Sequence, residues 1–335
     1  MNADDRRELV HGFATVLQDV LSIDGMLEAS RTGGFEAELR VTMGEMGWFD
    51  LALEEEAGGL GLTVADLAPL SLVTGYHLLP IPFLFESFAL APCASAGEMD
   101  QVLDRLRSGT GAGGGAVVPL SDEGTRVPDE RIVMALAPDA VDAVVVGRRS
   151  SVVIDLSSAD GEPLAGTDLV SGQTRVTAAG AVEVADTEAI YRTMLVCLLA
   201  DCVGAAQAAL DLAVEYAGER EQFGRTIASF QAVSHLLATA KVDLELSMSS
   251  LSRLVQLMES GSPSLDPYLA SMVHAIPQRA RVACEHSIQV HGGAGFTWEA
   301  GLHLFYRRVL QTQAALGGTV GTADHAGTLL IEGVR

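Results

Sequence analysis

The sequence predicts a mainly α-helical fold with a small β domain between two helical regions. Apolar residues recur at helical spacing through residues 1–110. Short runs rich in Val and Ile, separated by Gly, Pro, Asp and Ser, fill residues 116–186, and long helical patterns return over residues 187–335. A chain of 335 residues, 48% of them hydrophobic, can bury a sizeable core within these three regions.

The N-terminal region, residues 1–110, is expected to form several helices. A second helix is predicted over about 34–46, and Thr63 is a plausible N-cap for a helix over 64–79 that carries Asp66 in its first turn. The glycine-rich stretch 109–115 lacks the Lys-Ser/Thr that follows in a phosphate loop, so it is interpreted as a linker. The first helix shows the apolar spacing most plainly, at Leu9, Phe13, Val16, Leu17 and Val20.

The middle region, residues 116–186, is predicted to be a compact barrel or meander of short strands. After it, four long helical patterns predict an antiparallel bundle. The expected strands are 116–120, 132–135, 143–146, 152–156, 174–177 and 181–184, and the expected helices are 189–216, 230–258, 265–290 and 298–313.

Composition excludes some classes of partner. The formal net charge of −23 argues against nucleic acid or an anionic membrane surface. The first residues do not resemble a signal peptide, and apolar runs of about ten residues are short for a membrane span, so a cytoplasmic protein is expected. No metal site is expected, because the cysteines lack ligand spacing and are interpreted as core residues.

Two segments, residues 216–231 and 289–296, combine polar side chains with breaks in a helical pattern. The first contains Arg220 and Gln231, and the second contains Gln289 and a Gly-Gly pair. Exposed backbone N–H groups beside a guanidinium are suited to a diphosphate. The sequence therefore predicts that these segments hold one end of a nucleotide cofactor.

Three motifs, in this order, resemble the acyl-CoA dehydrogenase family, and so does the order of the three regions. The resemblance implies an FAD-dependent enzyme that removes hydrogen from the α and β carbons of an acyl-CoA thioester, with a carboxylate as the base. The motifs are Gly47-Trp48 with residues 56–62 and Asp66-Leu67, then Tyr216 with Phe223-Gly224 and Phe230-Gln231, and finally Gln289-Val-His-Gly-Gly-Ala-Gly-Phe296.

The same resemblance implies which residues contact FAD. Arg220 is expected to bind the diphosphate or adenosine of an FAD held by a neighbouring subunit. His291 is expected to order the loop rather than to react. The other implied cofactor contacts are Phe223, Gln231, Gln289, Gly292, Gly293 and Thr319.

The sequence departs from the family where the base should stand. The family places its Glu at one of two positions, which are here occupied by Gly317 and Met194, and neither can accept a proton. Asp201 lies on the same helix face as Met194, two turns on. It is either a substitute base or a polar residue satisfied at a helix contact. The middle region also lacks the family's Trp, since the only two are Trp48 and Trp298.

With these departures, the chain resembles one branch of the family, the α2β2 heterotetramers of bacterial steroid and cholesterol side-chain degradation. There, one chain holds the base and the flavin ring, and the other completes its partner's FAD site. The resemblance implies that this chain is the second kind, a subunit without catalytic residues beside a homologous partner. Two alternatives stay open: a self-sufficient homo-oligomeric dehydrogenase with Asp201 as base, and a flavin-free acyl-CoA-binding scaffold.

Overall fold

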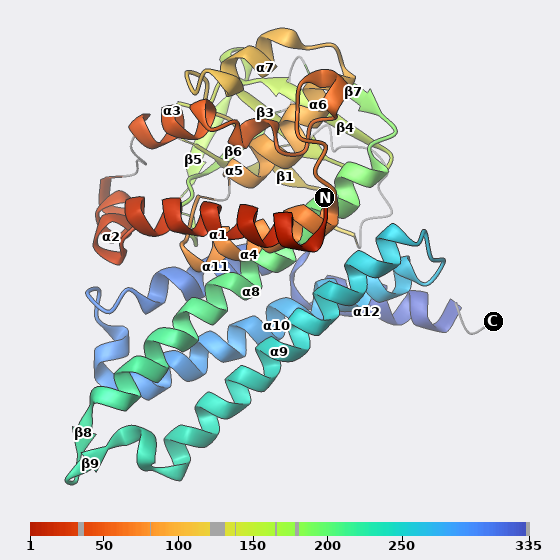
Figure 1. The fold of residues 1–335 in the computed structure, drawn as a ribbon. Coiled ribbons are helices and arrows are strands. Elements are labelled where there is room, and N and C mark those ends of the chain that lie inside the picture. Colours follow the sequence, from red (N-terminus) through yellow and green to blue (C-terminus); the bar gives the residue numbers. More distant parts are fainter. Residues whose placement is uncertain are drawn as a thin grey trace.

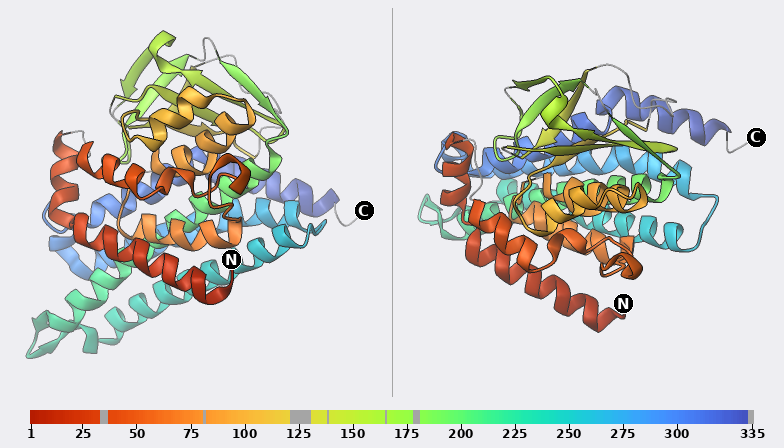
Figure 2. Two further views of the ribbon diagram at one scale, coloured as in Figure 1. Left: turned by 45° about the horizontal axis from the view of Figure 1, so that its top comes forward. Right: turned by 90° about the horizontal axis from the view of Figure 1, so that it is seen from above.

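A computed structural model describes residues 1–32, 37–80, 82–120, 131–137, 139–164, 166–177 and 181–332. Over these residues, helices α1–α7 precede a seven-stranded sheet and helices α8–α12 follow it, which confirms the predicted mainly α fold with a small β domain. The sheet lies at one end of the molecule and the C-terminal helices at the other, with the N-terminal helices packed beside both (Figures 1 and 2).

The N-terminal helices begin and end largely where local chemistry dictates. Thr63 is the N-cap of α4, and the carboxylate of Asp66 accepts the Thr63 backbone N–H at 3.1 Å. Part of the predicted helix over 34–46 lies outside the described residues, and its remainder is α3. The elements are α1 (Ala3–Val20), α2 (Ile23–Thr32), α3 (Ala37–Glu45), α4 (Val64–Tyr76), α5 (Pro82–Phe85), the π-helical turn η3 (Glu86–Leu90), α6 (Ala91–Ala96) and α7 (Asp100–Arg107).

The sheet has the strand order β5-β6-β2-β1-β3-β4-β7. β1 lies between β2 and β3, antiparallel to the first and parallel to the second, so of the two expected arrangements, barrel or meander, the meander is wrong. Its strands are β1 (Gly114–Val117), β2 (Arg131–Leu136), β3 (Asp142–Val146), β4 (Ser150–Asp155), β5 (Gly161–Leu164), β6 (Gln173–Thr177) and β7 (Val182–Ala185).

The predicted linker over 109–115 is wrong at its end, because Gly114 and Gly115 belong to β1. A Cβ atom at Gly115 would overlap the carbonyl of Val144 and press on the ring of Phe85. The glycines therefore allow β1 to lie close to its neighbouring strand and to α5, a packing role that composition alone does not reveal.

The C-terminal region is a helical bundle centred on α8, which is buried along most of its length. α8 is long and apolar enough to cross a bilayer, contrary to the expectation of only short apolar runs, but 89% of its most apolar window is buried, as in a core helix. The helices are α8 (Glu188–Glu219), α9 (Gln231–Glu259), α10 (Leu265–His291), α11 (Leu302–Ala315) and α12 (Gly318–Glu332), the last of which was not predicted.

Two glycines set the closeness of α4 and α8. A Cβ atom on Gly75 would overlap the carbonyl of Asp201, and one on Gly204 would overlap that of Leu72. The two helices therefore approach more closely than side chains would otherwise permit. This contact places Asp201 against α4, in the centre of the molecule.

Candidate functional site

Both halves of the predicted cofactor motif lie at one end of the bundle, where α8, α9 and α10 meet (Figure 1). We call residues 216–231 and 289–296 the bundle tip. The rings of Tyr216 and His291 stack with centroids 4.3 Å apart and join the two segments. A ring nitrogen of His291 lies 2.9 Å from the carbonyl oxygen of Ser287, so its orientation is fixed. Segments far apart in sequence thus form one surface.

A short hairpin projects from the bundle tip. β8 (Glu221–Gln222) pairs with β9 (Arg225–Thr226), and the turn residues Phe223 and Gly224 both have positive φ, 55° and 77°. Such a turn suits a two-residue hairpin, but Phe is strained in this conformation by about 1–2 kcal/mol. The side chain is nevertheless 93% exposed. A strained, exposed aromatic ring contributes little to the stability of this chain, which points to a contact outside it.

The bundle tip presents polar groups that the chain itself leaves free. Arg220 is the C-cap of α8, and its exposed guanidinium has no hydrogen-bond partner among the described residues. The side chains of Gln231 and Gln289 are likewise exposed and free within the described part of the chain. Beside them, Gly292 has φ +59°, and the space above Gly292 and Gly293 is open. A cation, two amides and approachable backbone therefore gather here.

Thr319 does not belong to this surface. Its hydroxyl accepts from Gln278 of α10 at 3.3 Å and from Gln313 of α11 at 3.2 Å. Gln278 lies about three turns before Gln289 on α10, roughly 16 Å away along the helix. Within one chain Thr319 therefore lies apart from the bundle tip, because α12 packs against α10. The expected contact of Thr319 with FAD stays a prediction.

The two family base positions differ in burial, because Met194 is buried and Gly317 is half-buried. Met194 is fully buried on α8. Gly317 is in the turn between α11 and α12 with φ +106°, a conformation that L side chains rarely adopt. The backbone at residue 317 therefore suits glycine and would be strained by a Glu.

Asp201 belongs to a buried ion-pair cluster centred on Arg308. Its carboxylate accepts the Thr74 hydroxyl at 2.8 Å, and both of its oxygens lie 3.2 Å from Nη1 of Arg308. Nε of Arg308 also donates to Asp168 at 2.6 Å. The side chains of Arg308, Asp168 and Asp201 are all 0% exposed. We call these three residues the buried triad.

The contacts of Asp201 within the triad indicate a structural role for this residue rather than the role of a catalytic base. Burial raises the pKa of its carboxyl, while Arg308 and the Thr74 hydroxyl act in the opposite direction. Both carboxylate oxygens already have partners, and Asp201 lines neither of the two cavities described below. A general base must reach the proton that it takes, and Asp201 reaches only its own partners.

A cavity of about 390 Å³ lies between the sheet, α8 and α11, next to the turn that contains Gly317. We call it the sheet cavity. Its polar side chains, among the described residues, are Gln173, Gln311 and Thr312, and the Thr312 hydroxyl is buried without a partner. The other lining residues are Phe85, Gly115, Ala116, Val117, Pro119, Ile132, Val133, Ala135, Leu198, Ala314 and Ala315.

The described residues of the sheet cavity do not fit a flavin ring well. The pyrimidine edge of a flavin carries several donors and acceptors, and each needs a partner when it is buried. Mainly aliphatic walls leave most of them unsatisfied. The bundle tip fits the opposite end of FAD, because Arg220 and the free backbone above Gly292 and Gly293 can meet a diphosphate.

Sequence reasoning found the bundle tip but missed Arg308, Asp168 and a second cavity around Arg40. The sequence signal that indicates such buried residues is a charged residue among the apolar residues of a helical pattern, as at Arg308 and Asp201. Such residues are rarely buried unless they are paired, so each predicts a buried partner. The spacing of residues in the sequence does not identify that buried partner.

Comparison with known proteins supports one family. The family described as acyl-CoA dehydrogenase, C-terminal domain, matches residues 192–321. The acyl-CoA dehydrogenase IpdE2 of Mycobacterium tuberculosis is 30% identical over 84% of this chain and 82% of its own length. The ChsE4–ChsE5 complex of Mycobacterium tuberculosis has a similar fold, with a TM-score of 0.78, 22% identity, and coverage of 99% and 98% of the two chains.

A variant of the Tcur3481–Tcur3483 steroid ACAD is similar in fold over 99% of both chains, with a TM-score of 0.79 and 21% identity. These two structural likenesses establish the fold, and the similarity to IpdE2 over most of both lengths establishes kinship. Together with the order of helices, sheet and bundle, they show that this chain belongs to the acyl-CoA dehydrogenase family.

Proposed function

We propose that this chain is a subunit of a heteromeric FAD-dependent acyl-CoA dehydrogenase and completes the FAD site of a homologous partner. Family membership gives the coarser statement, an FAD-dependent oxidoreductase of the acyl-CoA dehydrogenase type. The observation that carries the finer proposal is a contrast within the chain. The bundle tip offers free polar groups to an outside ligand, whereas the sheet cavity is mainly apolar.

The tip residues would bind the diphosphate and adenosine end of the partner's FAD. Arg220 would neutralise phosphate charge, and Gln231 and Gln289 would donate amide hydrogen bonds. Phe223, at the exposed end of the hairpin, would cover an apolar face of the cofactor or of the partner. When bound, FAD supplies the acceptor for the hydride that leaves the β carbon of the substrate.

The base that removes the α proton would come from the partner. Met194 and Gly317 cannot accept a proton, and the oxygens of Asp201 are held by Thr74 and Arg308. A homo-oligomer that uses Asp201 as base therefore needs the buried triad to open. The two structural relatives are named as pairs of chains, ChsE4–ChsE5 and Tcur3481–Tcur3483, which supports a heteromeric assembly. An α2β2 composition is part of the same proposal.

A steroid-derived acyl-CoA is the substrate class that we propose, since one structural relative is described as a steroid ACAD. The acyl group would be bound largely by the partner, next to its flavin ring. A cytoplasmic location suits a CoA thioester and is part of the same proposal.

The test is to express the chain alone and together with the homologous dehydrogenase encoded beside it, and to record visible spectra and particle mass. We expect a colourless chain alone and a yellow complex that contains both chains. A yellow, active single chain would overturn the proposal in favour of the homo-oligomer. A colourless complex that still binds CoA thioesters would overturn it in favour of a scaffold.

A further inference from the structure

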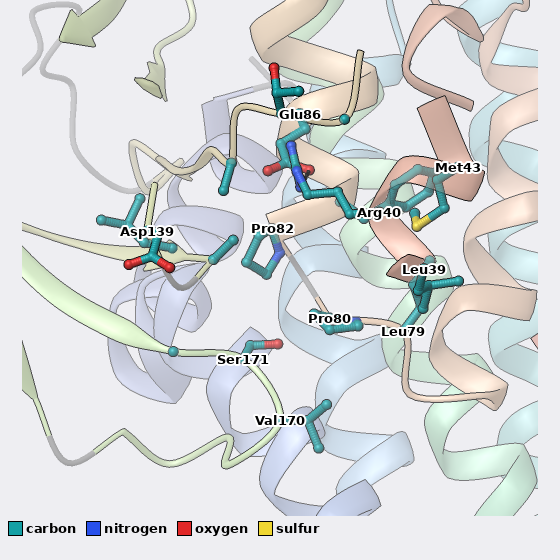
Figure 3. A pocket seen from close by; sticks show the side chains of 17 residues that line it. Leu39, Arg40, Met43, Leu79, Pro80, Pro82, Glu86, Asp139, Val170 and Ser171 are labelled. Carbon is teal, nitrogen blue, oxygen red and sulfur yellow. Dashed lines mark hydrogen bonds and ion pairs between the residues drawn. The ribbon is translucent and has the colours of Figure 1, made fainter. Parts of the chain in front are cut away.

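A second cavity, of about 230 Å³, lies between the N-terminal helices and the sheet (Figure 3). We call it the Arg40 cavity. It shares no lining residue with the sheet cavity and none with the bundle tip. Its apolar walls include Leu39 and Met43 of α3, Pro82 and Phe83 of α5, and Val170 from the loop before β6. Thr110, Asp139 and Gly172 are the exposed lining residues and mark the mouth.

One charged side chain extends into this cavity and has one hydrogen-bond donor that is not used. Arg40 donates from Nε to the carbonyl of Gly111 at 2.7 Å and from Nη1 to Glu86 at 2.8 Å. Its Nη2 is buried and has no hydrogen-bond partner among the described residues. Figure 3 shows the Arg40 side chain reaching into the cavity toward Glu86, with Asp139, Val170 and Ser171 on other sides.

Glu86 does not bond the remaining donor. Its second oxygen accepts the backbone N–H of Gly113 at 2.5 Å, and the carboxylate is 1% exposed. Glu86 also begins the π-helical turn η3, and π-turns in helices often occur at functional sites. A buried donor without a partner is unfavourable, so the free Nη2 in the cavity wall is suited to an acceptor atom from outside the chain.

The charges around the cavity decide which acceptor fits. The positive charge of Arg40 is matched by Glu86 at 2.8 Å, and Asp139 adds a further negative charge at the mouth. The lining as described is therefore net negative and disfavours an incoming carboxylate or phosphate. A neutral carbonyl oxygen accepts from Nη2 without adding charge.

The volume and the apolar walls of the cavity determine which kind of molecule can carry this carbonyl group. An apolar cavity of about 150 Å³ holds a benzene molecule, so a slightly larger ring with one polar substituent fits this volume. Apolar walls with one placed polar group are the common design of small-molecule sites. We propose that the Arg40 cavity binds a small neutral alicyclic ligand through a ketone-type carbonyl, independently of the cofactor site at the bundle tip.

Binding is tested on the complex of both chains by isothermal titration with three probes: cyclohexanone, cyclohexanecarboxylate and cyclohexane. We expect cyclohexanone to bind most tightly, because only it is neutral and carries the acceptor. Tighter binding of the carboxylate would overturn the charge argument. Equal binding of cyclohexane would overturn the role of Arg40, and no binding of any probe would overturn the site.

Two variants locate the binding. Arg40→Lys keeps the charge opposite Glu86 but removes Nη2, and we expect it to weaken cyclohexanone binding at least tenfold. Val170→Phe fills the cavity and leaves Arg40 in place, and we expect it to abolish binding. Arg7→Lys, on the exposed face of α1, is the control and should change nothing. If Arg40→Lys fails to fold, Val170→Phe alone decides, and unchanged binding in that variant would refute the proposal.

Discussion

Two arginines of this chain have opposite surroundings. Arg308, in the buried triad, has no exposed surface and is paired with Asp168 and Asp201. Arg220, at the bundle tip, is exposed and free among the described residues. The chain has 44 acidic residues against 21 Lys and Arg, so carboxylates are not scarce. An exposed arginine without a partner adds little to stability, so the guanidinium of Arg220 is available to a ligand from outside the chain.

The comparison also separates two kinds of polar site. The buried triad holds the loop before β6, α8 and α11 together, because Asp168, Asp201 and Arg308 come from these three parts. The charged groups of the buried triad have their hydrogen-bond partners within the chain. The bundle tip has donors without acceptors, so its chemistry is completed only from outside. Substitutions in each site test whether the buried triad stabilises the fold and whether the bundle tip binds a ligand.

Arg308→Met should have the largest effect. It leaves two carboxylates buried without a counter-charge, which costs about 3–5 kcal/mol of the free energy of unfolding. Urea unfolding of the purified complex measures the loss. Without Arg308, burial raises the pKa of the Asp201 carboxyl further, so the deficit grows as pH rises above the unfolded pKa of Asp201 and shrinks in acid.

The matched control for Arg308 replaces the whole triad. Asp168→Leu and Asp201→Leu combined with Arg308→Met remove every buried charge of the cluster and should recover most of the lost stability. If Arg308→Met alone unfolds at the same urea concentration as the parent, the triad contributes no such stabilisation.

Arg220→Ala should leave stability unchanged within about 0.5 kcal/mol, because the side chain is exposed and unpaired. The flavin content of the co-expressed complex should fall, with FAD binding weakened roughly tenfold to a hundredfold, since a hydrogen bond to a charged group is worth about 1.5–3 kcal/mol. Visible absorbance per complex measures it. Arg253→Ala, at an exposed position on α9, should keep full flavin content.

Phe223→Asn should separate stability from function at the hairpin. Asn tolerates positive φ better than Phe, so the free energy of unfolding should rise by up to about 1 kcal/mol. The loss of the exposed ring should lower flavin content or weaken subunit association, measured by absorbance and by mass photometry. A gain in stability with unchanged flavin content and association would show that the ring contacts neither cofactor nor partner.

Asp66→Asn should change stability modestly and leave flavin content unchanged, because Asp66 is not part of the bundle tip. Burial acts to raise the pKa of Asp66, but the Arg6 guanidinium at 2.8 Å and the Thr63 groups outweigh it and hold the pKa below 3.8. A depressed carboxyl pKa contributes stability above the unfolded pKa and loses it as pH falls through the folded one. The substitution should therefore cost about 1 kcal/mol at pH 7 and progressively less below pH 4. A loss of equal size throughout this range would exclude the carboxylate charge as its source.

Local patterns predicted much of the fold. Thr63 and Asp66 fixed the start of α4, and the apolar periodicity located α8, α9 and α10 to within a few residues. These features depend on neighbours in sequence, which is why they can be read there. The place of β1 between β2 and β3, the helix α12 and the roles of Gly114 and Gly115 depend on packing partners that are distant along the chain.

The cofactor motif divides in the same way. The sequence alone shows that Arg220, Gln231 and Gln289 lie at breaks in a helical pattern, and that residues 194 and 317 carry no base. Only the folded chain shows that the two segments share one exposed end, that Thr319 lies elsewhere, and that Asp201 is held by Arg308. The physical reason is that a residue's chemistry is local, whereas its burial and its partners are set by how distant helices pack.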